Sequence, residues 1–418
     1  MRSQKMKVLL VLLSLLIFSC SSLIKAVPRA SMETNLQELR VCADPPLEIN
    51  GNTELADAAS SGDGSSGNPY IIQNKVINAS GLAKNGIYIQ NTNAHFILRN
   101  CNVTGTDVDY VGIRLDNVTN ARLENNNIYN NGDSGILLWE SYMVQLTGNT
   151  VLNHENNSGI GVSYCEKITL TDNVVYYSKW AIYLYYSNDS VLSDNTVYNN
   201  SMEGIHLNCA DNNTVTRNTA YNNTNNGIYL YYADNNTLSN NTAYCNRNAG
   251  ISLMNSHNNT LFNNVAYNNS QWGVRVGLGM NNMLINNTVI NNHIDGFYLW
   301  FTEKNTLMNN TAIVNTNGGI YLYNSDNNTL IGNLAVLNDG GIYLWSSDYN
   351  LIKQNKLYNN SYCIFEMNST GNVIIDNDCV GAMQQIPGLN FAWIIAVVFG
   401  LSMVKILWKK PIKSKESL

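Results

Sequence analysis

Arg275, His293 and Asp295 are the residues of this 418-residue chain whose types and spacing come closest to a catalytic set. A polysaccharide lyase would use a base such as arginine beside Ca²⁺-binding carboxylates. A glycoside hydrolase would instead use two carboxylates about 5–10 Å apart. No paired acidic cluster accompanies the three residues, so they are candidates for catalysis without a complete constellation around them.

Arg275 stands in a segment that interrupts two rows of aromatic residues. In the run Gly273-Val-Arg-Val-Gly-Leu-Gly, Gly277 and Gly279 take positions where neighbouring segments have larger side chains. This pattern predicts a notch between Met254 and Trp300. A glycine-relieved bulge, or a simple break in the rows, is the structural alternative.

The aromatic rows themselves are candidates for ligand binding. They consist of paired residues separated by one position, which in a strand point to the same side: Tyr183/Tyr185, Tyr229/Tyr231, Tyr298/Trp300, Tyr321/Tyr323 and Tyr343/Trp345. Flat rings with a polar edge suit stacking on sugars. Cross-strand stacking that stabilises an exposed sheet is the alternative explanation.

A repeat of about 23 residues positions all of these side chains. Thirteen asparagines, from Asn100 to Asn377, recur 22–26 residues apart, and a residue that is glycine in eleven of the thirteen units lies fourteen residues before each one. Alternating runs such as Gly-Ile-Tyr-Leu follow the glycine and indicate strands with one buried face. The sequence predicts an all-β parallel β-helix of about thirteen coils. We place the recurrent asparagine at a left-handed turn position, where its amide can bond to the asparagines above and below it.

The coils Gly-Ile-x-Leu, Asn-Asn-Thr-Leu and Asn-Asn-Thr-Ala resemble the right-handed parallel β-helix repeats of pectin-lyase-like proteins, and most of all the NosD-like subgroup. The segment 62–72, Gly-Asp-Gly-Ser-Ser-Gly-Asn-Pro-Tyr-Ile-Ile, is similar to the opening coil of such domains. The resemblance covers residues 45–380. It implies a right-handed solenoid and, through the NosD-like subgroup, a role in copper insertion as one alternative.

The sequence contains few residues that are spaced as metal ligands. The five histidines form no ligand pair at strand spacing, and His257 and Met280 are the one suggestive pair, because they occupy equivalent positions in successive coils. Acidic residues recur at the same position, where capping of turns is the structural reading: Asp211, Asp234, Glu303, Asp326 and Asp348. We expect no metal site and no cofactor.

The two ends of the chain indicate export and membrane attachment. Residues 1–26 have the basic and then apolar pattern of a secretory signal. Residues 27–80 are expected to form an N-terminal segment and opening coil, and residues 81–382 the β-helix. A linker and transmembrane helix at 383–408 and a basic cytoplasmic tail at 409–418 are expected to follow. Cys363 and Cys379 fall in the last coil and can bridge it.

Asparagine sequons add to the case for a cell-surface protein. Candidates for glycosylation are Asn78, Asn102, Asn117, Asn235, Asn258, Asn286 and Asn368. The structural alternative is that Asn-Asn-Thr is also what the turns require.

The net charge of −6 and the absence of a basic patch make nucleic acid an unexpected partner. The sequence therefore predicts an exported, membrane-anchored β-helix on the cell surface. Its aromatic rows would meet a surface glycan or another surface protein. A carbohydrate-active enzyme, either a polysaccharide lyase or a glycoside hydrolase, and a NosD-like copper accessory protein are the alternatives.

Overall fold

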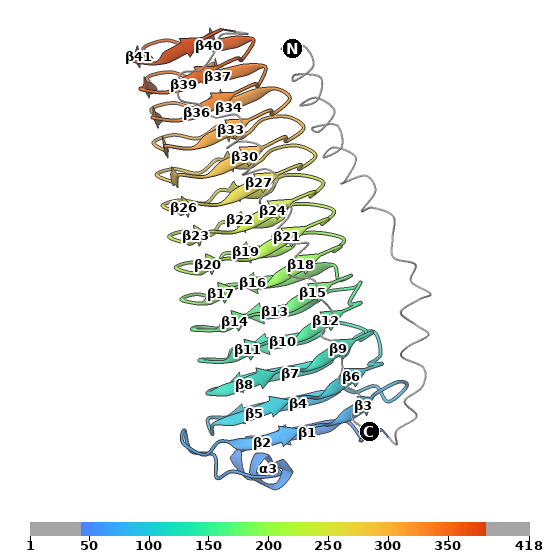
Figure 1. Ribbon diagram of the computed structural model, residues 1–418. Coiled ribbons are helices and arrows are strands. Elements are labelled where there is room, and N and C mark those ends of the chain that lie inside the picture. The colour runs from blue at the N-terminus through green and yellow to red at the C-terminus, as the bar shows by residue number, and fades with distance from the viewer. Residues whose placement is uncertain (1–42, 382–418) are drawn as a thin grey trace, which may run out of the picture.

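The computed structural model describes residues 43–381, which form a rod of stacked coils (Figure 1). Each coil contributes one strand to each of three parallel sheets, and each sheet has fourteen strands. Stacked strands lie about 4.8 Å apart, so the rod is on the order of 60 Å long.

Strands of the first sheet carry the predicted aromatic rows. They are β1 (Leu47–Asn50), β4 (Ile87–Thr92), β7 (Ile113–Val118), β10 (Ile136–Trp139), β13 (Ser158–Ser163), β16 (Trp180–Tyr185), β19 (Ile205–Asn208), β22 (Ile228–Tyr231), β25 (Ile251–Met254), β28 (Val274–Gly277), β31 (Phe297–Trp300), β34 (Gly318–Tyr323), β37 (Gly340–Trp345) and β40 (Tyr362–Met367).

The other two sheets are built from shorter strands. The second contains β2 (Tyr70–Gln73), β5 (Phe96–Arg99), β8 (Ala121–Glu124), β11 (Gln145–Thr147), β14 (Thr169–Thr171), β17 (Val191–Ser193), β20 (Thr214–Thr216), β23 (Thr237–Ser239), β26 (Thr260–Phe262), β29 (Met283–Ile285), β32 (Thr306–Met308), β35 (Thr329–Ile331), β38 (Leu351–Lys353) and β41 (Val373–Ile375). The third contains β3 (Val76–Asn78), β6 (Asn102–Thr104), β9 (Asn127–Tyr129), β12 (Thr150–Leu152), β15 (Val174–Tyr176), β18 (Thr196–Tyr198), β21 (Thr219–Tyr221), β24 (Thr242–Tyr244), β27 (Val265–Tyr267), β30 (Thr288–Ile290), β33 (Thr311–Ile313), β36 (Leu334–Val336), β39 (Lys356–Tyr358) and β42 (Asp378–Val380).

The interior of the rod is filled by apolar side chains in the columns that the repeat predicts. In the coil that contains β22, β23 and β24, the inward residues Ile228, Leu230, Leu238 and Ala243 are all fully buried. Alternation places these residues inside and their neighbours outside, because successive side chains of a strand point to opposite faces. The predicted β-helix is confirmed in this respect.

The recurrent glycine is required for a close approach between coils. A Cβ on Gly227 would lie 2.6 Å from the carbonyl oxygen of Gly250 in the next coil and 2.7 Å from Nδ2 of Asn246. The backbone here needs no left-handed conformation, so the space between coils, and not the dihedral angles, selects glycine.

The recurrent asparagines form the expected ladder, but they do not occupy the left-handed position. That position is one residue earlier: Asn240 has φ of 56°, whereas the buried Asn241 follows it. The same two-residue unit recurs at the other corners, with Asn235 before Asn236 and Cys245 before Asn246. Asn100, the first residue that we assigned to the asparagine ladder, lies outside the ladder as well.

In that first unit, Asn100 takes the left-handed position with φ of 53°. The ladder position falls on Cys101, whose backbone N–H donates to Oδ1 of Asn126 at 3.0 Å. The ladder position in this coil is therefore one residue later than Asn100. The long interval of 26 residues between Asn100 and Asn126 indicates this offset in the sequence.

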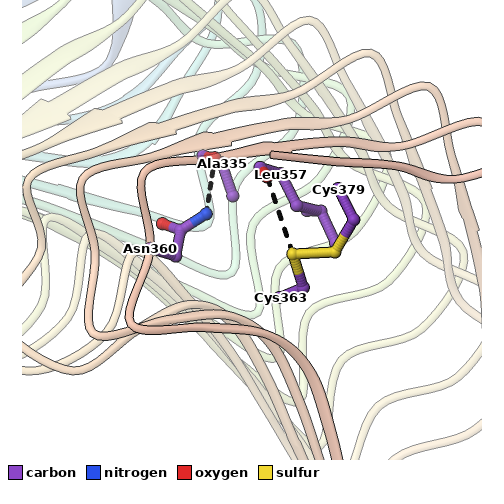
Figure 2. The surroundings of a disulfide bond; sticks show 5 residues. All are labelled: Ala335, Leu357, Asn360, Cys363 and Cys379. Carbon is purple, nitrogen blue, oxygen red and sulfur yellow. Dashed lines mark hydrogen bonds between the residues drawn. A yellow bond between two sulfur atoms is a disulfide. The ribbon is translucent and has the colours of Figure 1, made fainter. Parts of the chain in front are cut away.

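The two ends of the rod differ in structure. At the N-terminal end, the helix α3 (Gly51–Ala58) lies across the first coil and buries Leu55 completely (Figure 1). At the other end, Cys363 and Cys379 form the expected disulfide within the last described coil, as Figure 2 shows. The Sγ atom of Cys363 lies 3.8 Å from the carbonyl oxygen of Leu357.

The structure refines the predicted fold class in two respects. It has fourteen turns, because β1, β2 and β3 form a turn before the thirteen coils of the repeat, inside the segment where we expected an opening coil. Leu47 pairs with Ile87, forty residues later, because α3 and the loop after it are inserted in this turn. The interval is longer than the repeat, so the period does not reveal the turn.

The second correction concerns the expected transmembrane helix. Residues 383–408, like the expected signal at residues 1–26 and tail at 409–418, lie outside the described residues. Among the residues that are described, no helix is both long and apolar enough to cross a bilayer. The fold of the described residues is a parallel β-solenoid.

Candidate functional site

The first sheet presents two outward columns from β16 to β37, which we call the aromatic face. Strand pairing places Tyr183, His206, Tyr229, Ser252, Arg275, Tyr298, Tyr321 and Tyr343 in one column. The second column contains Tyr185, Asn208, Tyr231, Met254, Gly277, Trp300, Tyr323 and Trp345. All ten aromatic residues that the sequence singled out lie on this face.

The rings of the aromatic face contact one another and also remain accessible. Tyr321 lies 5.7 Å from Tyr298 and 5.6 Å from Tyr343 between ring centroids, in tilted and edge-on arrangements. Nine of the ten predicted residues are half-buried, and Trp345 is exposed at 37%. Mutual packing therefore holds the rings in place while leaving part of each one available to a ligand.

The predicted notch at Gly277 is not open. Met254 and Trp300 close over the glycine, and a Cβ there would lie 2.6 Å from Sδ of Met254 and 3.0 Å from Cε3 of Trp300. The glycine is needed because the two larger side chains converge on its position. This correction depends on side-chain directions, which the spacing of residues does not determine.

Arg275 is held among aromatic rings and forms no ion pair with the residues that the structure describes. Its Cζ lies 4.9 Å from the ring centre of Trp272 and 5.4 Å from that of Trp300. The Nε atom is buried and has no hydrogen-bond partner among the described residues. Burial lowers the pKa of the guanidinium below its usual value.

Asp295 lies beneath the aromatic face and is 1% exposed. Its Oδ1 accepts hydrogen bonds from the backbone N–H of Gly318 and from Nδ2 of Asn317, both at 2.8 Å. Burial raises the pKa of this carboxyl to about 7, although these hydrogen bonds and one from Trp272 oppose the rise. A carboxyl with this pKa can exchange a proton near neutral pH.

The three candidate catalytic residues are not assembled into one site. His293 is exposed, and its backbone N–H donates to the carbonyl oxygen of Asn269. No hydrogen bond or ion pair among the described residues joins Asp295 to Arg275 or to His293. The structure places Arg275 and Asp295 around Trp272 and leaves His293 apart from them.

Sequence reasoning missed a second buried carboxyl of the same kind. Glu203 is 3% exposed and accepts from Nε1 of Trp180 at 3.0 Å and from Nδ2 of Asn225 at 2.5 Å. Burial raises its pKa. Glu203 and Asp295 both directly precede the recurrent glycine, and Trp180 and Trp272 precede them by 23 residues. That shared spacing was the signal in the sequence.

His206 lies between two tyrosines of the aromatic face. Its ring centre is 5.0 Å from that of Tyr183 and 4.9 Å from that of Tyr229. Neither ring nitrogen has a hydrogen-bond partner among the described residues, and burial lowers the pKa to about 4. The histidine is therefore neutral at physiological pH and acts as part of the ring stack.

The acidic column serves the turns, as its structural reading predicted. The carboxylate of Asp211 accepts from the backbone N–H of Asp234 at 2.7 Å, and that of Asp234 accepts from His257 at the same distance. Nδ1 of His257 in turn accepts from the backbone of Met280 at 3.1 Å. Within residues 43–381, no group of three or more histidine, cysteine, aspartate or glutamate residues is arranged to hold a metal ion.

The outer surface of the third sheet carries a tyrosine stack that the sequence analysis did not identify. The rings of successive coils lie 4.8–4.9 Å apart and within 8° of parallel. The members are Tyr176, Tyr198, Tyr221, Tyr244 and Tyr267. The regular spacing of 22–23 residues between these tyrosines is the signal for the stack in the sequence.

The candidate glycosylation sites mostly occupy left-handed turn positions. Asn117, Asn235, Asn258, Asn286 and Asn368 have φ between 52° and 57° and are exposed. Asn78 is exposed as well, whereas Asn102 is half-buried within β6. In Asn235-Asn236-Thr237 the middle residue is a buried asparagine of a ladder, so the sequon also satisfies the turn.

A hollow of about 390 Å³ lies on the second sheet, away from the aromatic face. Its lining includes His95, Arg122, Gln145 and Lys167. Arg122 is paired with Glu124, and Lys167 donates to the hydroxyl of Tyr142. These cations therefore already have partners.

Comparison with solved structures finds proteins that share the β-helix fold. A point mutant of the periplasmic alginate epimerase AlgG is 16% identical with a TM-score of 0.56, over 80% of this chain and 84% of that one. The A-module of Azotobacter vinelandii mannuronan C-5 epimerase AlgE6 is 15% identical with a TM-score of 0.47, over 72% and 91% of the two chains. At these identities the likeness shows the fold alone.

Sequence families agree with the architecture. Among curated proteins, no sequence matches the chain. The family described as periplasmic copper-binding protein (NosD) matches residues 266–387. The family described as right handed beta helix region matches residues 58–192 and 158–312, which together cover more than half of the chain. The chain therefore belongs to the right-handed β-helix family.

Proposed function

We propose that this protein is exported and binds a glycan along the aromatic face of its first sheet. The observation that carries the proposal is the in-register row of half-buried rings from β31 to β37, where Tyr298, Tyr321 and Tyr343 contact one another in sequence. Rings on a rigid parallel sheet are ordered before a ligand arrives, so binding costs little side-chain entropy. The apolar C–H faces of sugars suit such rings.

Two observations support export. The pattern of residues 1–26 is that of a secretory signal, and the match of residues 266–387 is to a family described as periplasmic. The alginate epimerase indicates that a rod of this shape is compatible with polysaccharide ligands, although its activity does not transfer at 16% identity. A surface protein is the alternative partner for the same face.

A glycan array probed with the purified full-length chain tests the proposal, with released products analysed in parallel. We expect retention without cleavage. The double substitution Tyr321→Ala and Trp345→Ala should weaken retention by about tenfold, because two ring contacts are lost. The control is Tyr221→Ala, which truncates a ring on the third sheet and should not change retention.

Two outcomes would contradict the proposal. Cleavage products would show an enzyme and would direct mutagenesis to Arg275 and Asp295. No retention on the array, together with a protein partner whose binding is lost in the double variant, would reassign the face to protein recognition.

A further inference from the structure

We propose that Arg275, flanked by Trp272 and Trp300, is the subsite at which the aromatic face holds a negatively charged group of its glycan, either a uronate carboxylate or a sulfate ester. The inference rests on the proposed glycan binding and adds the class of ligand. It places one anionic group at β28, with sugar rings along the aromatic residues on either side.

The first argument is that Arg275 is a desolvated cation that no described group neutralises. The ion pairs among the described residues involve other cations. Its Nε is buried without a partner, and its contacts are with the rings of two tryptophans. A partly buried charge without a counter-ion is costly, so an anion delivered by a ligand would relieve that cost.

The second argument is a comparison within the chain. Arg114 occupies the same outward column in β7, where it contacts the ring of Tyr88. Two residues further along that strand, Asp116 pairs with Arg114 at 2.8 Å and raises the pKa of the guanidinium. The residue two positions after Arg275 is Gly277, which supplies no carboxylate. The same arrangement is therefore internally neutralised in β7 and left open in β28.

The third argument concerns geometry. Ring contacts engage a guanidinium through its flat face, whereas its N–H donors point outward in its plane. Planar guanidinium groups bind carboxylate and sulfate oxygens through two parallel hydrogen bonds. Arg275 is only half-buried, and its neighbours in the column, Ser252 and Tyr298, carry no charge that would repel an anion.

The test uses two pairs of polymers that differ only in charge. Polygalacturonate is compared with its carboxyl-reduced neutral form, and dextran sulfate with dextran, by affinity electrophoresis of the full-length chain. We expect preference for the charged member of one pair, which identifies the anion as carboxylate or sulfate. Arg275→Gln should weaken binding of that polymer at least about tenfold, the loss of one charge-assisted contact, and leave the neutral polymer unaffected.

Two controls separate the subsite from general charge effects. Arg114→Gln removes an arginine that is already paired and should leave the preference intact. Arg275→Lys keeps the charge but loses the planar fork and should retain part of the preference. If Arg275→Gln fails to fold, Arg275→Lys still decides, because a preference that depends on the planar fork at this position requires a contact with Arg275.

The outcomes distinguish the inference from the proposed function. Equal binding of charged and neutral polymers, unchanged in Arg275→Gln, overturns the anionic subsite and leaves glycan binding in place. Binding of no charged polymer also overturns it, and the array with the Tyr321→Ala and Trp345→Ala variant then decides separately whether the aromatic face binds glycans at all.

Discussion

A buried asparagine at a corner of the rod makes several hydrogen bonds at once. Nδ2 of Asn241 donates to the carbonyl oxygen of Val215 at 2.8 Å and to Oδ1 of Asn264 at 3.0 Å, and its backbone N–H also donates to that Oδ1. Its own Oδ1 accepts from the backbone and the side chain of Asn218. Each asparagine thus connects the coil before it to the coil after it.

Asn241→Leu should reduce the free energy of unfolding by about 1–3 kcal/mol, because the buried groups around it lose their partners. Thr237→Leu is the matched control, since Thr237 belongs to the same coil but is exposed, and should change stability by no more than about 0.5 kcal/mol. Chemical denaturation of the three proteins measures both effects. A stability of Asn241→Leu equal to that of the wild type would count against the ladder as a stabilising element.

The buried carboxyl of Asp295 should make stability depend on pH in a definite direction. Burial raises its pKa from 3.8 to about 7 in the folded protein. The folded state therefore binds the proton more tightly than the unfolded state. The resulting stabilisation is complete below pH of about 4 and is lost as the pH rises through about 7, at up to about 1.4 kcal/mol per pH unit.

Asp295→Asn removes this titration while keeping an oxygen that can accept from Gly318 and Asn317. We therefore expect the variant to gain stability relative to the wild type as the pH rises from 5 to 8. Denaturation curves at the two pH values measure the gain, with the exposed Asp109→Asn as control. A difference that stays constant across this range would show that Asp295 does not titrate as proposed.

At the residue scale, the sequence predicts inward positions better than site chemistry. Inward residues such as Ile228 and Leu238 follow from alternation and period alone. The burial of Asp295 instead depends on Asn317 and Trp272, which come from the coils on either side of it. A comparison of the residues directly before the recurrent glycine in successive coils groups Glu203 with Asp295. The closure over Gly277 depends on the rotamers of Met254 and Trp300 and has no comparable signal.

Among the elements, the last described coil contains a disulfide bond on which its stability depends. Many side chains of β40, β41 and β42 are exposed, including Val373 at 49% and Ile375 at 42%. The disulfide between Cys363 and Cys379 closes a segment with a sequence separation of 16. In the chain-entropy account, closing a loop of this length stabilises the folded state by about 3 kcal/mol, because it restricts the unfolded segment.

Replacing Cys363 and Cys379 by serine should therefore loosen this coil and leave the rest of the rod unchanged, because each coil contacts only its neighbours. Hydrogen exchange should become faster for amides of β40, β41 and β42 and stay the same in β22, β23 and β24. A uniform loss of protection along the whole rod would instead show that the disulfide acts on the global unfolding equilibrium.

The architecture of the whole molecule follows from the repeat, because every coil buries apolar side chains at the same positions. The period predicts the strands, their parallel stacking and the position of the closing disulfide. It does not reveal the first turn, in which α3 separates β1 from its pairing partner β4 by forty residues. Nor does it support the expected membrane helix, which came from hydropathy outside the repeat.

Deleting one whole coil, residues 227–249, should leave a folded but shorter rod. Gly204 would then precede Gly250 by one period, so the ladders and the three sheets stay in register. Deleting only residues 239–249 should abolish folding, because β24 would be lost from the third sheet and the following coil would be displaced. Circular dichroism and thermal unfolding of the two variants measure the contrast, and similar behaviour of both would contradict a register set by the repeat.

The tyrosine stack on the third sheet has an optical consequence. Five phenol rings, held nearly parallel at 4.8–4.9 Å from Tyr176 to Tyr267, are close enough for their electronic transitions to couple. The near-ultraviolet dichroism of the rod should therefore exceed the sum of its separate tyrosines. Burial also raises the pKa of these phenols, so they should ionise only at strongly alkaline pH. The stack is thus an intrinsic chromophore whose signal reports, without any label, whether neighbouring coils remain in register.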